Sequence, residues 1–204
     1  MRHDAVLLDM DGTLVESHAA VERAWRAWAA EHGVDVERAL AVAHGSPAER
    51  TARLLLPHAS DAEIEVAAAR QLALQYDDLG DVVAAPGAAA LLAGLDARGV
   101  PWAVVTSADV PLARARLGAA GIDPPLLVTC EDVVHGKPAP DPYLLASARL
   151  GVRPERCLVV EDAPSGVASG RAAGMVVAGV GGVEADLALG ALVDLLDVVD
   201  ATDA

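Results

Sequence analysis

The chain of 204 residues carries 30 acidic and 15 basic side chains, which give it a net charge of −15. So acidic a protein is repelled by nucleic acids and by anionic membrane surfaces, which excludes both as partners. Apolar residues make up 53% of the chain, but only 2% of the residues are aromatic and Phe is absent, so Ala, Val and Leu must fill the core.

The sequence gives no sign of secretion or of membrane insertion. No stretch reaches the length that spans a membrane, and the N-terminus enters a strand pattern at once instead of a signal peptide. Cys130 and Cys157 each lie in an apolar run, where we expect buried packing instead of a disulfide. We therefore expect a cytoplasmic protein, acting as a monomer.

The first predicted strand is the apolar run 5–8, which ends at the motif Asp-Met-Asp-Gly-Thr-Leu. A helix is predicted over 17–32, with Ser17 as its N-cap and Gly33 as its stop. Two capping boxes, at 46–49 and 60–63, begin further helices. Residues 17 to 80 therefore contain three or four helices and no convincing strand.

After Pro86 the pattern changes to strands alternating with short helices. This alternation is typical of parallel βαβ units. The predicted strands are 102–106, 126–129, 157–160 and 175–178, and the predicted helices are 87–98, 111–120, 141–150 and 164–173. We predict an α/β fold, in which residues 1–16 and 82–204 form a Rossmann-like parallel sheet flanked by helices and residues 17–81 form an inserted all-helical cap.

Polar side chains that could take part in catalysis or ligand binding follow four of the predicted strands. Asp9 and Asp11 are only two residues apart, so their carboxylates repel each other. A divalent cation between them would remove this repulsion and leave one oxygen free to attack phosphorus. The ends of parallel strands share one edge, where open α/β sheets bind ligands, so we expect one common pocket. Its side chains are the pair Asp9 and Asp11, the hydroxyls of Thr106 and Ser107, the ammonium of Lys137, and the pair Glu161 and Asp162.

Lys137 is the only lysine of the chain, since the other fourteen basic residues are arginine. It stands in a Gly-Lys-Pro turn at 136–138. A compact ammonium acts as a point charge that neutralises both a phosphate and a nearby carboxylate. The choice of lysine at this one position therefore indicates a site for a phosphoryl group.

The motifs Asp-x-Asp-Gly-Thr, Thr-Ser, Gly-Lys-Pro and Glu-Asp resemble, in this order, the four motifs of the haloacid dehalogenase-like (HAD) hydrolase superfamily. The helical segment after the first motif resembles the small helical cap of that superfamily, and the resemblance covers nearly the whole chain. The phrases at 22–28, 43–45, 100–107 and 160–164 are similar to bacterial sugar and hexitol phosphatases of the β-phosphoglucomutase-like subgroup.

The resemblance implies hydrolysis of small phosphorylated sugars or sugar alcohols with Mg²⁺ as cofactor. Asp9 is the implied nucleophile, which forms an aspartyl phosphate, and Asp11 the implied general acid and base. Mg²⁺ would be held by the carboxylates of Asp9 and Asp162 and by the backbone carbonyl of Asp11, with Glu161 acting on it through a water or another ligand. The groups implied in holding phosphoryl oxygens are Thr106, Ser107 and Lys137.

The cap of such an enzyme closes over the pocket and excludes water, so it is the expected source of specificity. We expect His44, Gly45 and Arg50 to contact the sugar or polyol. Trp25 and Trp28 are placed either along the cleft between cap and core or in the packing of the cap itself.

Other activities of the superfamily leave different marks in the sequence. Asp11 argues against a dehalogenase, and the absence of lysine from residues 17–80 argues against an enzyme that cleaves phosphonates through a Schiff base. A β-phosphoglucomutase-like mutase remains the main rival, although the cap has no lysine and Arg50 is displaced from the expected position. A phosphoglycolate phosphatase and a catalytically idle binding relative are further alternatives.

Overall fold

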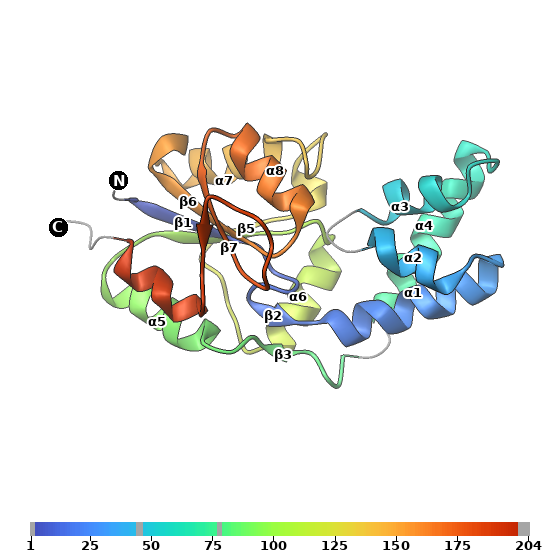
Figure 1. The fold of residues 1–204 in the computed structure, drawn as a ribbon, viewed down its shortest axis with the longest axis horizontal. Helices are drawn as coiled ribbons and strands as arrows, with labels where there is room; N and C mark the ends of the chain where they lie inside the picture. The colour runs from blue at the N-terminus through green and yellow to red at the C-terminus, as the bar shows by residue number, and fades with distance from the viewer. Residues whose placement is uncertain (1–2, 44–46, 77–78, 200–204) are drawn as a thin grey trace.

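The computed structural model describes residues 3–43, 47–76 and 79–199, and its centre is a six-stranded parallel sheet (Figure 1). The strand order is β5-β4-β1-β6-β7-β8, so β1 lies inside the sheet between β4 and β6. The strands are β1 Ala5–Leu8, β4 Trp102–Val105, β5 Leu127–Val128, β6 Cys157–Glu161, β7 Val176–Gly179 and β8 Leu187–Ala188. The predicted α/β fold with a Rossmann-like parallel sheet is confirmed.

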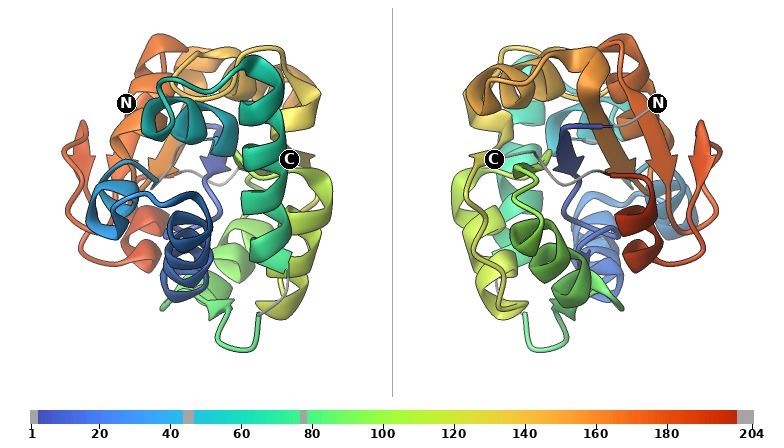
Figure 2. Two further views of the ribbon diagram at one scale, coloured as in Figure 1. Left: turned by 90° about the vertical axis from the view of Figure 1, so that its right-hand side faces the viewer. Right: turned by 90° about the vertical axis from the view of Figure 1, so that its left-hand side faces the viewer.

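Helices cover both faces of this sheet, because successive side chains of a strand point to opposite faces. Val6 and Leu8 pack in one apolar cluster with α5 (Ala88–Ala97) and α6 (Val110–Ala119). Ala5 and Leu7 pack in the other cluster with α7 (Asp141–Leu150) and α8 (Pro164–Ala172). The end-on views show β1 between these two helical layers (Figure 2). Fully buried strands of this kind read as continuous apolar runs, which is why the sequence predicted them.

Four helices form a separate group beside the sheet, which we call the helical unit. They are α1 His18–His32, α2 Val36–Ala43, α3 Ala48–Leu55 and α4 Asp61–Tyr76. The unit has its own apolar cluster, in which Trp28 is fully buried and donates its indole N–H to the carbonyl of Ala67 at 2.7 Å. Trp25 packs edge-on against Trp28. The helices stand apart from the sheet on one side of the molecule (Figure 1).

The chain enters and leaves the helical unit through a small antiparallel pair, β2 (Val15–Glu16) and β3 (Val83–Ala84). Of the expected helix caps, Ser60 forms its capping box with Glu63. Ser17 is the N-cap residue of α1 and Gly33 follows its last turn, as expected. The hydroxyl of Ser17, however, does not bond to the backbone of α1 and instead donates to Asp11 at 2.6 Å.

Short elements escaped prediction because they carry too few residues to show a period. They are the pair β2 and β3, β8 at the edge of the sheet, and the 3-10 turns η1 Cys130–Asp132, η2 Pro154–Arg156 and η3 Leu192–Asp197. β5 is also shorter than the expected strand 126–129. Within the described ranges, none of the helices combines the length and the apolar character needed to cross a lipid bilayer.

Candidate active site

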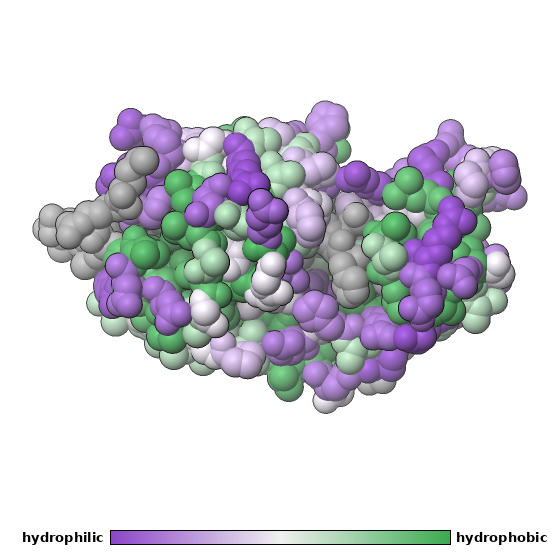
Figure 3. Space-filling view, in the orientation of Figure 1, coloured by the Kyte–Doolittle hydropathy of each residue, from purple (hydrophilic) through white to green (hydrophobic). Residues whose placement is uncertain are grey.

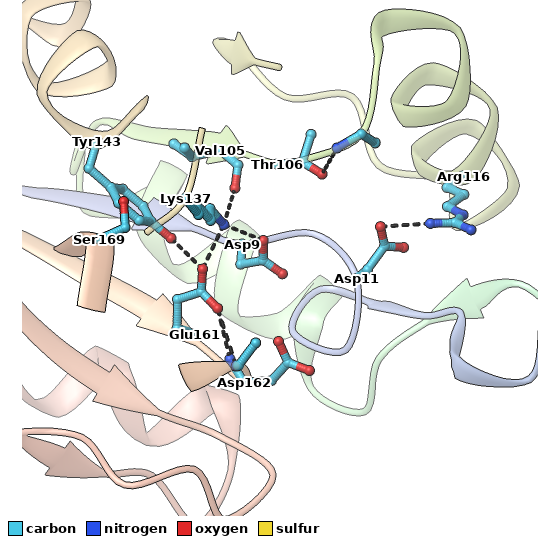
Figure 4. A network of polar contacts seen from close by, with 12 residues as sticks. Asp9, Asp11, Val105, Thr106, Arg116, Lys137, Tyr143, Glu161, Asp162 and Ser169 are labelled. Carbon is cyan, nitrogen blue, oxygen red and sulfur yellow. Dashed lines mark hydrogen bonds and ion pairs between the residues drawn. The ribbon is translucent and has the colours of Figure 1, made fainter. Parts of the chain in front are cut away.

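The predicted polar groups lie together at the carboxyl edge of the sheet. Asp9 follows β1, Thr106 follows β4, Glu161 ends β6 and Asp162 comes next. Since β4, β1 and β6 are neighbours in the sheet, these side chains reach the same place, and Lys137 joins them from the loop that follows η1 (Figure 4). All five residues line one cavity, whose opposite wall is built by the helical unit.

Lys137 is the centre of the buried charge network. Its ammonium contacts Oδ1 of Asp9 at 2.5 Å, Oε1 of Glu161 at 2.6 Å and the carbonyl of Val105 at 2.9 Å. An ammonium has three N–H donors, so each of them has a partner. The side chain of Lys137 is only 3% exposed, and such a buried charge is tolerated because it is paired and hydrogen-bonded.

Glu161 is held rigidly within this network. Oε1 also accepts from the hydroxyl of Tyr143 at 2.7 Å, and Oε2 accepts from the backbone N–H groups of Asp162 and Ala163 at 3.2 and 3.3 Å. Gly166 leaves room for this carboxylate, because a Cβ there would lie 1.7 Å from Oε1 of Glu161. With both oxygens engaged, Glu161 is suited to orienting its neighbours.

Asp162 lies directly beside the turn of the first motif. Gly12 has a φ of 82°, in the left-handed region that favours glycine, and a Cβ added to it would lie 2.0 Å from Oδ2 of Asp162. His18, at the start of α1, brings its Nε2 within 3.7 Å of the same oxygen. The neighbouring carboxylate of Asp162 is the main reason why the pKa of His18 is raised.

Three carboxylates converge closely enough to hold a metal ion. In the described part of the chain, ligand oxygens of Asp9, Glu161 and Asp162 all lie within 4.8 Å of one another. Lys137 supplies a single positive charge to these three acids, so the site carries an excess of negative charge. Carboxylate oxygens are the ligands that Mg²⁺ prefers, and the donor set therefore fits this ion.

The electrostatics of Asp9 and Lys137 reflect this imbalance. Burial raises the pKa of Asp9 well above its ordinary value, and the charge of Glu161 adds to the effect, while Lys137 opposes it. Burial by itself would lower the pKa of Lys137, but the charges of Asp9 and Glu161 outweigh it and the pKa rises. Lys137 is consequently a permanent cation, and a divalent cation beside Asp9 would favour its ionised form.

Asp11 points away from Asp9 (Figure 4). Its Oδ1 accepts from the hydroxyl of Ser17 at 2.6 Å, and its Oδ2 accepts from Nη1 of Arg116 at 2.7 Å. Arg116 comes from α6 and its side chain is only 2% exposed. In this structure Asp11 therefore accepts two hydrogen bonds near the N-terminus of α1.

Arg116 continues the network into the helical unit. Its Nη2 donates to Oε1 of Gln75 at 2.7 Å, and Nε2 of Gln75 donates to Oε1 of Gln71 at 2.6 Å. Both glutamines belong to α4 and line the same cavity as Asp9 and Asp11. A continuous polar chain therefore connects the sheet to the opposite wall of the cavity.

The hydroxyl pair at the end of β4 also reaches the cavity. Thr106 is buried, and its Oγ1 accepts from the backbone N–H of Ala108 at 3.1 Å. The Oγ of Ser107 is buried without a hydrogen-bond partner in the described structure. A phosphoryl oxygen is the kind of acceptor that such hydroxyl donors require.

The expected substrate contacts from the cap are less complete. His44 and Gly45 lie outside the described residues. Arg50 lies on α3, is exposed and is not among the residues that line the cavity. Trp25 lines the cavity and packs on Trp28, whereas Trp28 belongs to the interior of the helical unit.

Sequence reasoning missed several polar residues of the cavity region. Arg116 lies in a helix that contains several Ala and Leu residues, and Gln71 and Gln75 lie on a helix that is also rich in Ala and aliphatic residues. An arginine or glutamine on a helix is ordinarily solvated, so no local signal separates these three from surface residues. For Tyr143, the scarcity of aromatic residues was a signal that could have been used.

Comparison with known proteins gives a consistent result. A family model described as a hydrolase, haloacid dehalogenase-like hydrolase, matches residues 3–174. Hexitol phosphatase A of Escherichia coli is 47% identical over 181 residues, which cover 88% of this chain and 84% of that protein. Fructose-1-phosphate phosphatase YqaB of E. coli is 32% identical and covers 85% of this chain and 94% of its own.

A solved structure with the same architecture carries a phosphorylated sugar. It is a variant of CbbY from Rhodobacter sphaeroides in complex with xylulose-1,5-bisphosphate. The TM-score is 0.75 at 29% identity, and the superposition covers 95% of this chain and 96% of CbbY.

Proposed function

Because this chain belongs to the haloacid dehalogenase-like hydrolase family, we propose that it hydrolyses small phosphorylated sugars or sugar alcohols through an aspartyl phosphate on Asp9, with Mg²⁺ as cofactor. The chain is a phosphoric monoester hydrolase of the sugar-phosphatase type, as its relatives are. The proposed aspartyl-phosphate mechanism rests on one observation, the buried triad in which Lys137 joins Asp9 to Glu161.

In the first half-reaction, a carboxylate oxygen of Asp9 attacks phosphorus and the bond from phosphorus to the leaving oxygen breaks. Lys137 lies against Oδ1 of Asp9 and stabilises the negative charge of the phosphoryl oxygens as they approach. Thr106 and Ser107 donate to the same oxygens. Such fixed charges and donors supply most of the catalysis in phosphoryl transfer.

Asp11 completes both half-reactions as a proton carrier. In its protonated form it gives a proton to the leaving alcohol, and as a carboxylate it then takes one from the water that attacks phosphorus, which restores Asp9. For this role Asp11 must exchange the contact with Arg116 for the leaving oxygen.

Mg²⁺ would be held by the carboxylates of Asp9 and Asp162 and by the backbone carbonyl of Asp11, and when bound it offsets the negative charge of the acids and the phosphoryl group. Glu161, already fixed by Lys137 and Tyr143, positions these ligands. The absence of lysine from residues 17–81 favours a substrate with one phosphate over the bisphosphate that a mutase grips.

The helical unit acts, in this proposal, as the cap over the site, with residues 17–81 inserted between the two parts of the catalytic core. His44 and Gly45 remain proposed contacts of the substrate from this cap. Arg50 is not part of the site that we propose, because its side chain is exposed outside the cavity. We also retain the expectation that the enzyme acts as a monomer.

The test is release of inorganic phosphate from hexitol 6-phosphates, fructose 1-phosphate, phosphoglycolate and β-glucose 1-phosphate, measured with Mg²⁺ and with EDTA. We expect the highest kcat/KM for a sugar or hexitol phosphate, loss of activity in EDTA, and no turnover by Asp9→Asn. Conversion of β-glucose 1-phosphate into glucose 6-phosphate without free phosphate would replace the hydrolase by a mutase. Full activity of Asp9→Asn would end the proposed mechanism.

A further inference from the structure

The hydrogen-bond chain from Asp11 to Gln71 has a fixed direction. Arginine has donors and no acceptor, so Arg116 must face Oε1 of Gln75. This turns Nε2 of Gln75 towards Gln71, which must in turn present its own Oε1. The chain therefore ends at Nε2 of Gln71, and the assignment of nitrogen and oxygen in both amides follows from the single cation at its start.

Two donors of this chain have no acceptor in the described structure, namely Nε2 of Gln71 and Nε of Arg116. Gln71 is fully buried and Arg116 is 2% exposed. A buried donor without a partner is unfavourable, and two of them in one network are unusual for a region that serves packing alone. Both residues line the cavity that also contains Asp9 and Asp11, so a molecule bound there lies next to them.

The surrounding wall shows what kind of molecule these donors suit. Val21, Trp25 and Leu72 line the same side of the cavity and offer no polar group there apart from the indole of Trp25. A ligand that satisfies Gln71 and Arg116 must bring its own oxygen acceptors and must also leave apolar carbon against these side chains. A polyhydroxylated carbon chain has both properties, since each hydroxyl accepts as well as donates.

We propose that Gln71, Gln75 and Arg116 form the site that recognises the hydroxyl groups of the leaving alcohol. This inference rests on the proposed phosphatase function and names the groups that select its substrate. Hydroxyl oxygens of the sugar or polyol accept from Nε2 of Gln71 and from the guanidinium of Arg116. Because Arg116 also donates from Nη1 to Asp11, a hydroxyl bound to the same guanidinium lies beside the residue proposed to protonate the leaving oxygen.

The site makes a specific demand on substrates. A phosphate ester of the same length without hydroxyls leaves the donors of Gln71 and Arg116 unpaired, and sites built to bond a hydroxyl discriminate strongly against analogues that lack it. The ratio of kcat/KM for a hexitol 6-phosphate to that for n-hexyl phosphate measures this selectivity, because both esters contain the same phosphate on a six-carbon chain.

The experiment measures this ratio in the wild type and in Gln71→Met, which preserves the approximate volume of the side chain but removes its amide. Leu74→Met is the matched control, because Leu74 lies on the same helix and packs against the helical cluster instead of lining the cavity. We expect Gln71→Met to lower the ratio by about tenfold, the effect of losing roughly one hydrogen bond, and Leu74→Met to leave it within about twofold.

An unchanged ratio in a folded Gln71→Met enzyme would overturn the inference. If circular dichroism shows that Gln71→Met does not fold, Gln75→Met decides in the same way, since it removes the link between Arg116 and Gln71. Failure of the wild type to hydrolyse any of these esters would contradict the proposed function. A wild type that is active while both folded variants keep its selectivity would contradict only this inference.

Discussion

At the scale of single residues, the site is a problem of charge balance. Asp9, Glu161 and Asp162 bring three carboxyl groups to one buried place, and Lys137 brings one ammonium. One ammonium does not balance three carboxylates and the phosphate of a bound substrate. A divalent cation would supply the missing positive charge. Burial is the main cause that raises the pKa of Asp9, and the negative charge of Glu161 adds to it.

Replacing Lys137 by Met tests this balance. The variant leaves Asp9 and Glu161 without their common partner, so we expect loss of activity and a free energy of unfolding lower by about 3 kcal/mol, as for other buried ion pairs that lose one member. Urea unfolding and phosphate release measure the two effects. A matched control is Arg153→Met, which removes a cation that is 76% exposed and forms an ion pair with Glu155 at the surface. This change should affect neither measurement by much. Full activity of Lys137→Met would contradict the role given to this residue.

At the scale of elements, the strands whose ends form the site were predictable and the helical contacts were not. A buried parallel strand appears in the sequence as a continuous apolar run. The positions of Asp9, Thr106 and Glu161 at strand ends could therefore be predicted. Arg116 and Gln71 lie on helices, where nothing in the local pattern tells a buried polar residue from a solvated one. The link between them through Gln75 depends on how α4 packs against α6, which is a property of tertiary structure.

The N-terminal segment joins the sheet to the C-terminal segment, and this contact carries a pH dependence. His3 forms a bridge with Val199 and is 4% exposed. Burial is the main cause that lowers the pKa of His3 below 6.5, and Arg156 contributes. The unfolded chain therefore binds a proton more readily than the folded chain, so the folded state loses stability as the pH falls below 6.5.

We expect the stability of the His3→Gln variant to fall less than that of the wild type between pH 7.5 and pH 5.5. Urea unfolding of both proteins at the two pH values gives the comparison, and contributions of other groups cancel in the difference. Because neither state of His3 is protonated well above pH 6.5, the pH-dependent difference should be absent at pH 7.5 and above. An equal loss in both proteins would show that His3 has no part in the pH dependence.

At the scale of the whole molecule, hydrophilic residues are spread over both the sheet-containing part and the helical unit (Figure 3). The net charge of −15 gives the protein a surface that repels anions, so a phosphorylated substrate depends on local attraction. Lys137 and Arg116 are buried cations of the cavity, and in the proposed mechanism Mg²⁺ would supply the remaining positive charge. The sequence indicated the first of these cations by its uniqueness as a lysine, whereas the second is one arginine among fourteen and required the fold.

The central claim is that Asp9 takes the phosphoryl group, and trapping the covalent intermediate tests it most directly. The enzyme is mixed with Mg²⁺ and a hexitol 6-phosphate, quenched during turnover and treated with sodium borohydride, which reduces an acyl phosphate on an aspartate to homoserine. Peptide mass spectrometry then locates the change. The account predicts homoserine at position 9 only when substrate and Mg²⁺ are both present. The trapping procedure is first verified on a protein known to form an aspartyl phosphate. Reduction at another carboxylate of this enzyme, or an unmodified residue 9 in every quenched sample, would contradict the account.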